Sequence, residues 1–271
     1  MYWEGWLRGS ALRDSAFQPV KTIHLVHLAL HAALQDALDQ DLVARNVADG
    51  AHQAPKAGES PEMQVWTAPQ IRDFLRNCES ETLHPLLWLA AYTGMRRGEV
   101  LGLRWRDVNL VEGFASVRQQ ISRRRTEAGD IWDAVPPKTD AGRRRVDLDP
   151  ETVALLSRHR AGQTAHRLKM GPAYADADLV FARPDGRFLD PDSVTGMFEK
   201  LRRRSGLPRV RFHDLRHSHA TILLIGGAPV HLVAQRLGHA SPMVTLKVYA
   251  HVHPGGQAVA AAQFAAAIAG G

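Results

Sequence analysis

The sequence predicts a mainly α-helical fold that carries a small antiparallel β-sheet. Apolar residues recur every three or four positions over several long stretches, which is the spacing of helices with one buried face. Two Asp-Pro pairs, at 149–150 and 190–191, indicate helix starts, because aspartate caps a helix and proline suits its first turn. Only between Phe114 and Leu148 does the pattern change to the alternation that is typical of strands.

The composition is that of a globular protein with an excess of arginine. The chain has 271 residues, of which 45% are hydrophobic and 23% charged, so it can bury a core in one large or two smaller domains. Its net charge is +6, and only six of the 34 basic residues are lysine. The planar guanidinium fork suits phosphate, which favours a nucleic-acid partner. A genome rich in arginine codons explains the same excess, so charge alone does not decide.

Cysteine usage and hydropathy exclude several classes of protein. Cys78 is the single cysteine, so the sequence offers neither a disulfide framework nor a cysteine-based zinc site. The first residues lack the apolar core of a signal peptide, and no apolar run is long enough to span a bilayer. We therefore expect a cytoplasmic protein with no membrane partner.

The first predicted helix runs from Lys21 to Val43, with its apolar residues on one face. His24, His27 and His31 form a stripe beside that face. A metal site there would need a further ligand that the sequence does not offer. A solvated or DNA-facing edge is the better interpretation of this stripe.

A linker is predicted after this helix. Residues Asn46–Glu62 combine glycine, proline and polar residues without periodicity. We therefore divide the chain into a helical segment at 1–50, a linker at 51–65 and a larger domain at 66–271.

The larger domain shows clear helix and strand signals. Thr67 and Gln70 have the spacing of a capping box, and a second helix at 82–93 is apolar on most sides and ends at Gly94. The stretches FASVRQQI, IWDAV and RRVDL predict the strands of one antiparallel sheet, with Lys138 near the tip of its last hairpin. In the helix that begins after Thr67, the residues expected to face inward are Ile71, Phe74, Leu75 and Cys78. Later helices are expected after Asp149 and Asp190, at about 214–225, 230–237 and 242–250, and in the alanine-rich C-terminal segment.

Three stretches concentrate residues that suit chemistry: YTGMRRGEVLGLRW, RFHDLRHSHAT and QRLGHASPMVTLKVYAHV. Basic groups this dense are costly to bury without a negative partner. A metal held by His213, His217 and His219 is a poor explanation, because this spacing does not place all three on one helical face and no carboxylate accompanies them. A phosphate fits better, since arginines bind its oxygens while histidine and lysine move protons and tyrosine attacks.

Together with PPKTDAGRR, these stretches resemble the motifs of the tyrosine recombinases, the phage-integrase family. The resemblance covers roughly Trp66 to His253, and Lys21–Asn46 is more weakly similar to the last part of a core-binding domain. The match is specific because four separated motifs occur in the family's order. The positions that match the catalytic residues are Arg96, Lys138, His213, Arg216, His239 and Tyr249. The positions that match supporting residues are Glu99 and His217.

The resemblance implies that the Tyr249 oxygen attacks a DNA phosphorus and gives a 3′-phosphotyrosine link and a free 5′-hydroxyl. A phenol with a pKa near 10 is a weak nucleophile at neutral pH, so it needs a base and a cationic setting. Arg96 and Arg216 are expected to clamp the non-bridging oxygens and to stabilise the charge that develops in the transition state.

The remaining roles follow from the same resemblance. Lys138 is expected to protonate the leaving 5′-oxygen, His213 to assist proton transfer and His239 to donate a hydrogen bond to the phosphate. No metal or other cofactor is expected, because the arginines supply the positive charge. The covalent link conserves the bond energy, so rejoining needs no ATP.

The resemblance implies as partners double-stranded DNA attachment sites, further copies of the chain in a tetramer on DNA, and accessory DNA-bending proteins. A protein with these partners is expected to be associated with the nucleoid when bound to DNA. The C-terminal segment, with Phe264 and Ile268 on one face, can dock on a neighbouring protomer or pack on its own domain. Two alternatives stay open: a non-catalytic DNA-binding relic, because only part of a core-binding domain precedes the linker, and a type IB topoisomerase with the same chemistry.

Overall fold

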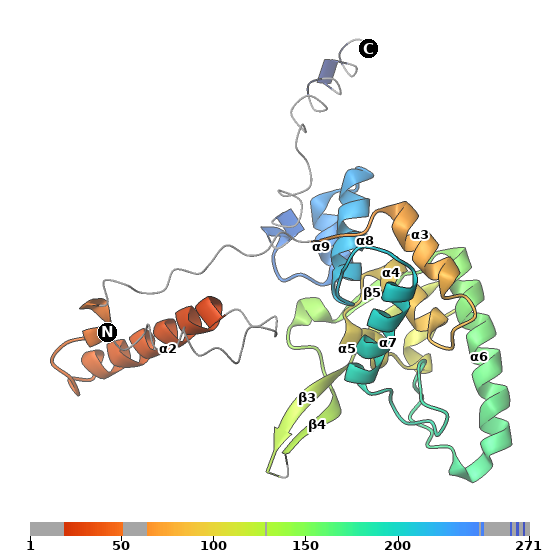
Figure 1. The fold of residues 1–271 in the computed structure, drawn as a ribbon, viewed down its shortest axis with the longest axis horizontal. Coiled ribbons are helices and arrows are strands. Elements are labelled where there is room, and N and C mark those ends of the chain that lie inside the picture. The colour runs from red at the N-terminus through yellow and green to blue at the C-terminus, as the bar shows by residue number, and fades with distance from the viewer. Residues whose placement is uncertain are drawn as a thin grey trace. The chain divides into compact units, whose positions relative to one another are not determined.

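The structure is a computed structural model, which describes residues 19–50, 64–127, 129–243, 245–246, 261, 264–265 and 268. The chain forms two compact units, Met1–Glu62 and Met63–Gly271, whose elements are drawn in Figure 1. In the described part of the chain, no helix is both long enough and apolar enough to cross a membrane.

The first unit contains a long helix, α2 (Pro19–Asp39), and a short 3-10 turn, η1 (Val47–Gly50). The expected helix at 21–43 is therefore confirmed, although it ends four residues early. The chain turns there because Asp41 takes a positive φ of 56°, which no helix accommodates.

The turn η1 packs back onto α2. Asn46 is 4% exposed, and its side-chain amide donates to the carbonyl of His31 at 3.1 Å and to Oε1 of Gln35 at 3.4 Å. His31 Nε2 lies 2.7 Å from Oδ1 of Asp49. Residues 46–50 thus belong to the folded first unit despite their linker-like composition, whereas residues 51–63 lie outside the described part.

The second unit is mainly helical, as the sequence predicts. Its helices are α3 (Ala68–Asn77), α4 (His84–Thr93), α5 (Arg97–Leu101), α6 (Pro150–Met170), α7 (Pro191–Arg204), α8 (Asp214–Ile225) and α9 (Val230–Leu237). Short 3-10 turns are η2 (Trp105–Asp107), η3 (Asp140–Gly142) and η4 (Gly171–Ala173). Its strands are β1 (Val108–Asn109), β2 (Phe114–Val117), β3 (Gln120–Thr126), β4 (Gly129–Val135) and β5 (Arg144–Asp147).

Local signals in the sequence fix several helix ends. The capping box of Thr67 and Gln70 is present at the start of α3, and the carboxylates of Asp149 and Asp190 accept backbone N–H groups at the starts of α6 and α7. Gly94 ends α4 in the left-handed conformation, with φ 64°. These helix limits agree with the sequence predictions because each depends on neighbouring residues alone.

Aromatic side chains join α3 and α7 in one core. Trp66, Phe74 and Phe198 are each at most 1% exposed, and the ring centroid of Phe74 lies 4.9 Å from that of Trp66 and 5.4 Å from that of Phe198. The backbone N–H of Trp66 donates to Oγ of Ser218 at 2.8 Å, which ties the entrance of α3 to α8. This core holds the ends of α4 and α8 in fixed positions.

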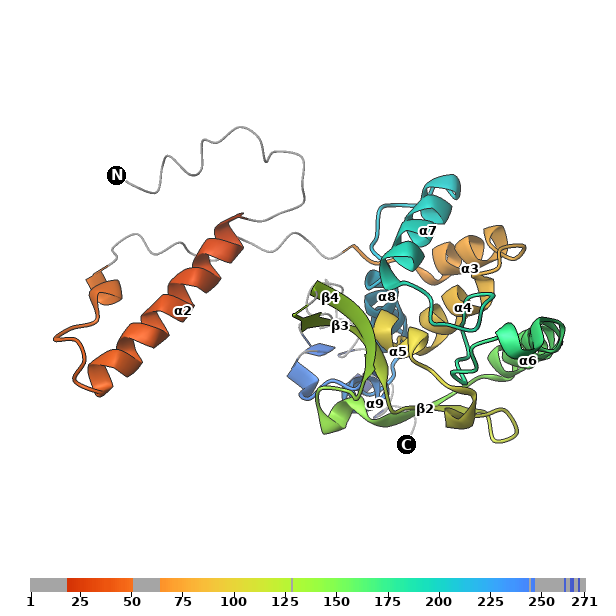
Figure 2. The same ribbon diagram turned by 90° about the horizontal axis from the view of Figure 1, so that it is seen from below.

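The strands form two separate sheets, so the single predicted sheet with a terminal hairpin is wrong in its pairing. Strands β1, β2 and β5 form a three-stranded antiparallel sheet, whereas β3 and β4 pair only with each other. The β3–β4 ribbon extends from the helical body, and Figure 2 shows α5 between this ribbon and α4. Lys138 therefore lies on the segment that connects the two sheets and not at a hairpin tip. Strand β5 pairs with β2 because Arg144, its first residue, is held by groups of α5 and α9.

The C-terminal part is described at only a few residues. Positions 242–243 and 245–246 are helical, and the rest of the expected helix at 242–250 lies outside the described residues. Phe264 and Ile268 are helical and are 71% and 69% exposed.

The left-handed turn at Gly94 leads to a first prediction. A Cβ at this position would lie 2.6 Å from Cδ2 of Leu237 and 2.9 Å from Cδ2 of His219. Since an L-residue in this conformation also costs about 1–2 kcal/mol, Gly94→Ala should lower the free energy of unfolding by about 2 kcal/mol or more. Urea unfolding curves measure this value.

Gly162→Ala is the matched control. Gly162 lies inside α6, where no atom comes within 4 Å of the added Cβ. This substitution should raise the free energy of unfolding by about 0.5–1 kcal/mol, because alanine favours the helix. Equal effects of the two substitutions would contradict the conformational explanation.

Candidate active site

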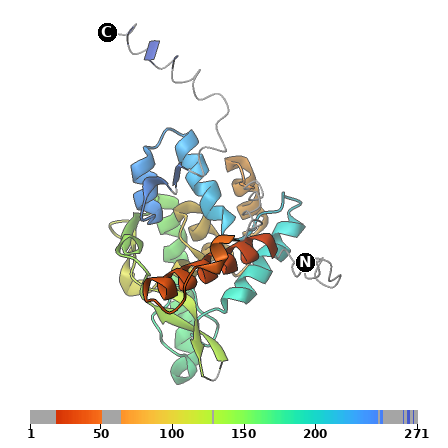
Figure 3. The same ribbon diagram turned by 90° about the vertical axis from the view of Figure 1, so that its left-hand side faces the viewer.

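Four segments that are distant in the sequence meet in the second unit: the α4–α5 junction, the start of β5, the start of α8 and the end of α9. Figure 3 shows α8 and α9, in neighbouring shades of blue, side by side at one end of this unit. The predicted site residues on these segments can therefore be compared within one cluster.

Arg216 lies in the first turn of α8 and is 2% exposed. Its Nη1 donates to the carbonyl of Gly94 at 2.9 Å, and its Nη2 donates to the carbonyl of Leu237 at 2.6 Å. Burial lowers the pKa of Arg216 to about 9, and the nearby positive charge of Arg96 adds to this shift. The guanidinium stays charged at neutral pH, and three of its five N–H groups bind no described residue.

Arg96 and Glu99 lie at the start of α5. Nη1 of Arg96 donates to Oε1 of Glu99 at 2.7 Å, and its Nη2 donates to the carbonyl of Gly238 at 3.3 Å. The Arg96 side chain is 37% exposed, whereas that of Glu99 is 1% exposed. Arg96 thus reaches solvent with three unused N–H groups while its orientation is fixed from behind.

Arg144 is a member of the cluster that the sequence reasoning missed. Its side chain is 5% exposed and grips Glu99 with two bonds, Nη2 to Oε2 at 2.9 Å and Nη1 to Oε1 at 3.1 Å. Burial by itself raises the pKa of Glu99, but the hydrogen bonds and charge of Arg144, with those of Arg96, outweigh it and hold this pKa below its ordinary value. The available signal was the alternation along β5, which places Arg144 on the same face as Val146.

Of the three predicted histidines, His217 and His239 are half-buried, whereas His213 is exposed to solvent on one side although protein packs around it. The rings of His213 and His217 meet edge to face, with centroids 5.0 Å apart. Nδ1 of His239 is hydrogen-bonded to Oγ1 of Thr245, a fully buried residue, at 2.8 Å. Burial lowers the pKa of His213 and of His239 to about 4, with further contributions from His217 and from Arg216, respectively. These imidazoles are therefore neutral at neutral pH.

Two predicted catalytic residues are not brought into this cluster by any described contact. Lys138 is exposed on the segment between β4 and β5 and makes no hydrogen bond or ion pair with a described residue. Its segment is nevertheless attached to the cluster, because Nη1 of Arg144 donates to the carbonyl of Gly142 at 3.2 Å. Tyr249 lies outside the described residues.

A second buried pair, His219 and Arg236, supports the cluster from behind. Nε of Arg236 donates to Nε2 of His219 at 3.1 Å, and Nδ1 of His219 donates to the carbonyl of Ala91 at 3.0 Å. Both imidazole nitrogens are used, so this ring has a structural role in joining α4, α8 and α9. The sequence reasoning had considered His219 only as a metal ligand.

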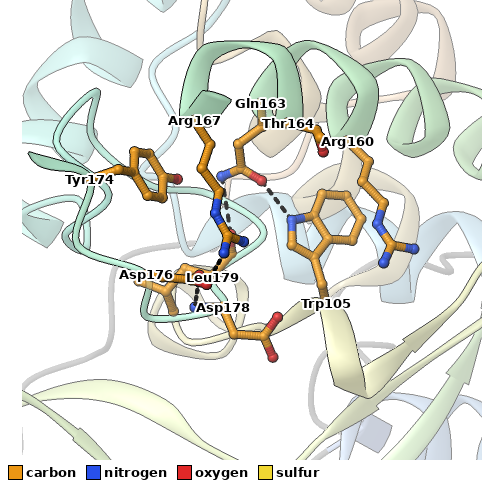
Figure 4. A pocket seen from close by; sticks show the side chains of 9 residues that line it. All are labelled: Trp105, Arg160, Gln163, Thr164, Arg167, Tyr174, Asp176, Asp178 and Leu179. Atoms are coloured by element: carbon orange, nitrogen blue, oxygen red, sulfur yellow. Dashed lines mark hydrogen bonds and ion pairs between the residues drawn. The ribbon is translucent and has the colours of Figure 1, made fainter. Parts of the chain in front are cut away.

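One cavity of the second unit borders the His219–Arg236 pair, and another lies apart from the cluster. One of about 130 Å³ is shown in Figure 4, where Arg160 lies against the ring of Trp105 and Nε1 of Trp105 donates to Oε1 of Gln163 at 2.6 Å. Its polar groups bind one another, so we assign it no ligand. A larger, mostly apolar one of about 650 Å³ lies behind His219 and Arg236.

The arrangement is suited to binding an anion with several oxygen atoms. Two guanidinium groups, those of Arg96 and Arg144, share the carboxylate of Glu99, and the guanidinium of Arg216 lies near them. The neutral imidazoles beside them can donate or accept one proton each. Within the described ranges, no group of three or more His, Cys, Asp or Glu side chains could hold a metal ion.

Comparison with known proteins gives a consistent result. A family model described as the phage integrase family matches residues 64–255. A tyrosine recombinase XerC-like protein of Caldanaerobacter subterraneus subsp. tengcongensis is 28% identical over 86% of this chain and 63% of its own length. The ICEBs1 integrase of Bacillus subtilis is 25% identical over 88% of this chain and 63% of its own length. The chain thus spans less than two thirds of these relatives.

Solved structures show the same fold. The Tn1549 transposon integrase in complex with transposon right end DNA has a TM-score of 0.74 at 22% identity, covering 91% of this chain and 79% of that one. The XerA recombinase has a TM-score of 0.57 at 24% identity, covering 88% of this chain and 75% of that one.

The buried histidine behind the cluster leads to a second prediction, on stability. Burial, with the charge of Arg236, lowers the pKa of His219 from 6.5 to about 4. Between these two values the unfolded chain binds a proton that the folded chain does not, so stability is complete above about pH 6.5 and falls as the pH drops toward 4. The loss contributed by this residue should reach up to about 3 kcal/mol.

Urea unfolding at pH 7.5 and pH 5.0 measures this loss. His219→Gln should be less stable than the wild type at pH 7.5 but should lose less stability on acidification. His231→Gln, at an exposed position of α9, should keep the wild-type pH dependence. Parallel pH dependences for all three proteins would exclude His219 as the titrating group.

Proposed function

Because the chain belongs to the phage integrase family, we propose that it is a site-specific DNA recombinase that cuts and rejoins DNA through a 3′-phosphotyrosine intermediate. The observation that supports this most strongly is the spare donor capacity of Arg96 and Arg216. Each uses two N–H groups on the protein and keeps three, and both are held by adjacent carbonyls at the end of α9. A scissile phosphate matches two such forks in charge and geometry.

In the proposed reaction, the Tyr249 oxygen forms a bond to phosphorus while the bond from phosphorus to the 5′-oxygen breaks. Lys138 donates a proton to the leaving 5′-oxygen, and His213 takes up the phenolic proton. His239 donates a hydrogen bond to the phosphate, with its other nitrogen held by Thr245. Rejoining is the reverse reaction, with a 5′-hydroxyl as the nucleophile.

We propose that this reaction needs no metal ion. The transition state gathers negative charge on the non-bridging oxygens, and two buried or half-buried guanidinium groups supply the compensating charge. Their fixed positions avoid reorganisation during the reaction, which is the usual advantage of a preorganised site.

The proposed partners are double-stranded attachment sites and further copies of the chain in a tetramer, with accessory DNA-bending proteins. The exposed Phe264 and Ile268 support docking of the C-terminal segment on a neighbour. A non-catalytic relic and a type IB topoisomerase are less well supported, because the family match includes every proposed catalytic position and the relatives cited above are named recombinase or integrase.

Replacement of the nucleophile tests the proposal directly. A nicked duplex made from the DNA that flanks the gene should trap the wild-type protein as a covalent adduct, which gel electrophoresis under denaturing conditions detects. Tyr249→Phe should give no adduct but bind DNA within about threefold of the wild type, because one hydroxyl adds little to a charge-dominated interface.

Tyr92→Phe is the matched control, since Tyr92 lies on α4 outside the cluster and its substitution removes the same atom. It should leave adduct formation intact. An adduct formed by Tyr249→Phe would refute the assignment of the nucleophile.

The general acid can be separated from the phosphate clamp by changing the leaving group. Lys138→Ala should cleave slowly on ordinary DNA and recover on a 5′-phosphorothiolate substrate, because a thiolate leaves without protonation. Arg96→Ala and Arg216→Ala should each lose on the order of 10²–10³ in cleavage rate and should not recover. Recovery of Arg216→Ala without recovery of Lys138→Ala would reverse the two assignments.

A further inference from the structure

We propose that Arg144 is a positioning residue for DNA cleavage: it holds Glu99 and the end of α9 so that Arg96 and Arg216 face the same phosphate. This inference rests on the proposed recombinase function. It concerns a residue that does not itself contact DNA, and it follows from how the N–H groups of the three arginines are used.

The donors of Arg144 are almost fully occupied by protein. Its Nε donates to the carbonyl of Arg236 at 2.6 Å, Nη1 donates to Glu99 and to the carbonyl of Gly142, and Nη2 donates to Glu99. Four of the five N–H groups are thus consumed, and the side chain is 5% exposed. With one spare N–H group and almost no exposed surface, Arg144 cannot hold a phosphate as a two-pronged fork.

The groups that Arg144 holds are those that hold the proposed clamp. Three consecutive carbonyls close α9, and each accepts from a different arginine: Arg236 from Arg144, Leu237 from Arg216 and Gly238 from Arg96. The bond from Arg144 to the Arg236 carbonyl fixes the direction of the chain at this helix end. It thereby also sets the direction in which the carbonyls of Leu237 and Gly238 point. Removing the first bond therefore releases the supports of both clamp residues.

Arg144 also affects Arg96 through the carboxylate of Glu99, which both arginines bind. Each of its carboxylate oxygens accepts from both arginines: Oε1 from the two Nη1 groups, and Oε2 from Nη2 of Arg144 and the backbone N–H of Arg96. Because its negative charge is shared, Arg96 keeps part of its positive charge for a phosphate. Without Arg144, Glu99 would neutralise Arg96 alone.

Neighbouring arginines supply matched controls. Arg143 and Arg145 flank Arg144 in the chain and are exposed. Arg145 pairs with Asp147, and no hydrogen bond or ion pair joins the Arg143 side chain to a described residue. Arg→Lys at each of the three positions keeps the charge but removes the planar fork. Only at position 144 does the guanidinium bond to two parts of the cluster, namely Glu99 and the end of α9.

The experiment measures single-turnover cleavage of the nicked flanking-DNA duplex at saturating protein concentration. Arg144→Lys should lower the rate constant about 100-fold, with DNA affinity within threefold, because a small displacement of catalytic groups has this effect. Arg143→Lys and Arg145→Lys should stay within threefold of the wild type. With DNA in excess over protein, the amount of adduct finally formed should not change, whereas partial misfolding would lower this amount and leave the rate constant at saturating protein intact.

A double substitution guards against misfolding of the single variant. Arg144→Met with Glu99→Gln removes both charges of the buried pair together, and the Arg96 guanidinium that loses its carboxylate is 37% exposed. The double variant should therefore unfold near the wild-type temperature while cleaving at least as slowly as Arg144→Lys. Cleavage by this double variant at the wild-type rate would overturn the inference.

Two further outcomes separate the inference from its premise. An Arg144→Lys rate within threefold of Arg143→Lys, or its full recovery on a 5′-phosphorothiolate substrate, would overturn the role of Arg144 and leave the recombinase function standing. Absence of any adduct with the wild type would overturn the proposed function, and the role of Arg144 in cleavage with it.

Discussion

The end of helix α9 is the constraint on which the candidate site depends. Its last carbonyls, at 236–238, point out of the helix and each accept from a guanidinium group that belongs to a different segment of the chain. Carbonyls at a helix C-terminus have no partner inside the helix, and they carry the negative end of its dipole, so they attract cations. One helix end thereby brings β5, α8 and the α4–α5 junction to a common point.

The count of free N–H groups distinguishes the arginines of the cluster better than their exposure does. Arg216 is more deeply buried than Arg96, yet both keep three donors, whereas Arg144 keeps one. A buried cation with unused donors is costly in the free protein, and the depressed pKa of Arg216 reflects this cost. An anionic ligand offsets that cost, so the unpaired charge makes the site favourable for an anion.

The sequence predicts features that depend on nearby residues better than features that depend on residues far away in the chain. Helix limits such as Thr67 and Asp149 were predictable because caps use residues within one turn. The cluster around Arg216 was predicted by resemblance and is assembled in the structure, but its tautomers and donor counts need coordinates. The pairing of β4 and β5 was predicted wrongly, because alternation permits several partners and the choice is made by Arg144 bonding across 45 and 92 residues.

Because three arginines follow one another at 143–145, the ion pair with Glu99 is compatible with more than one alignment of strand β5. If the strand shifted by one residue in either direction, another arginine would still face Glu99, so the ion pair alone cannot select the alignment of β5 against β2. The selection falls to Val146, which is 1% exposed and pairs with Ala115. A shift would bury Arg145 or Asp147 in its place. The alignment of the electrostatic site thus depends also on an aliphatic side chain, which carries no charge.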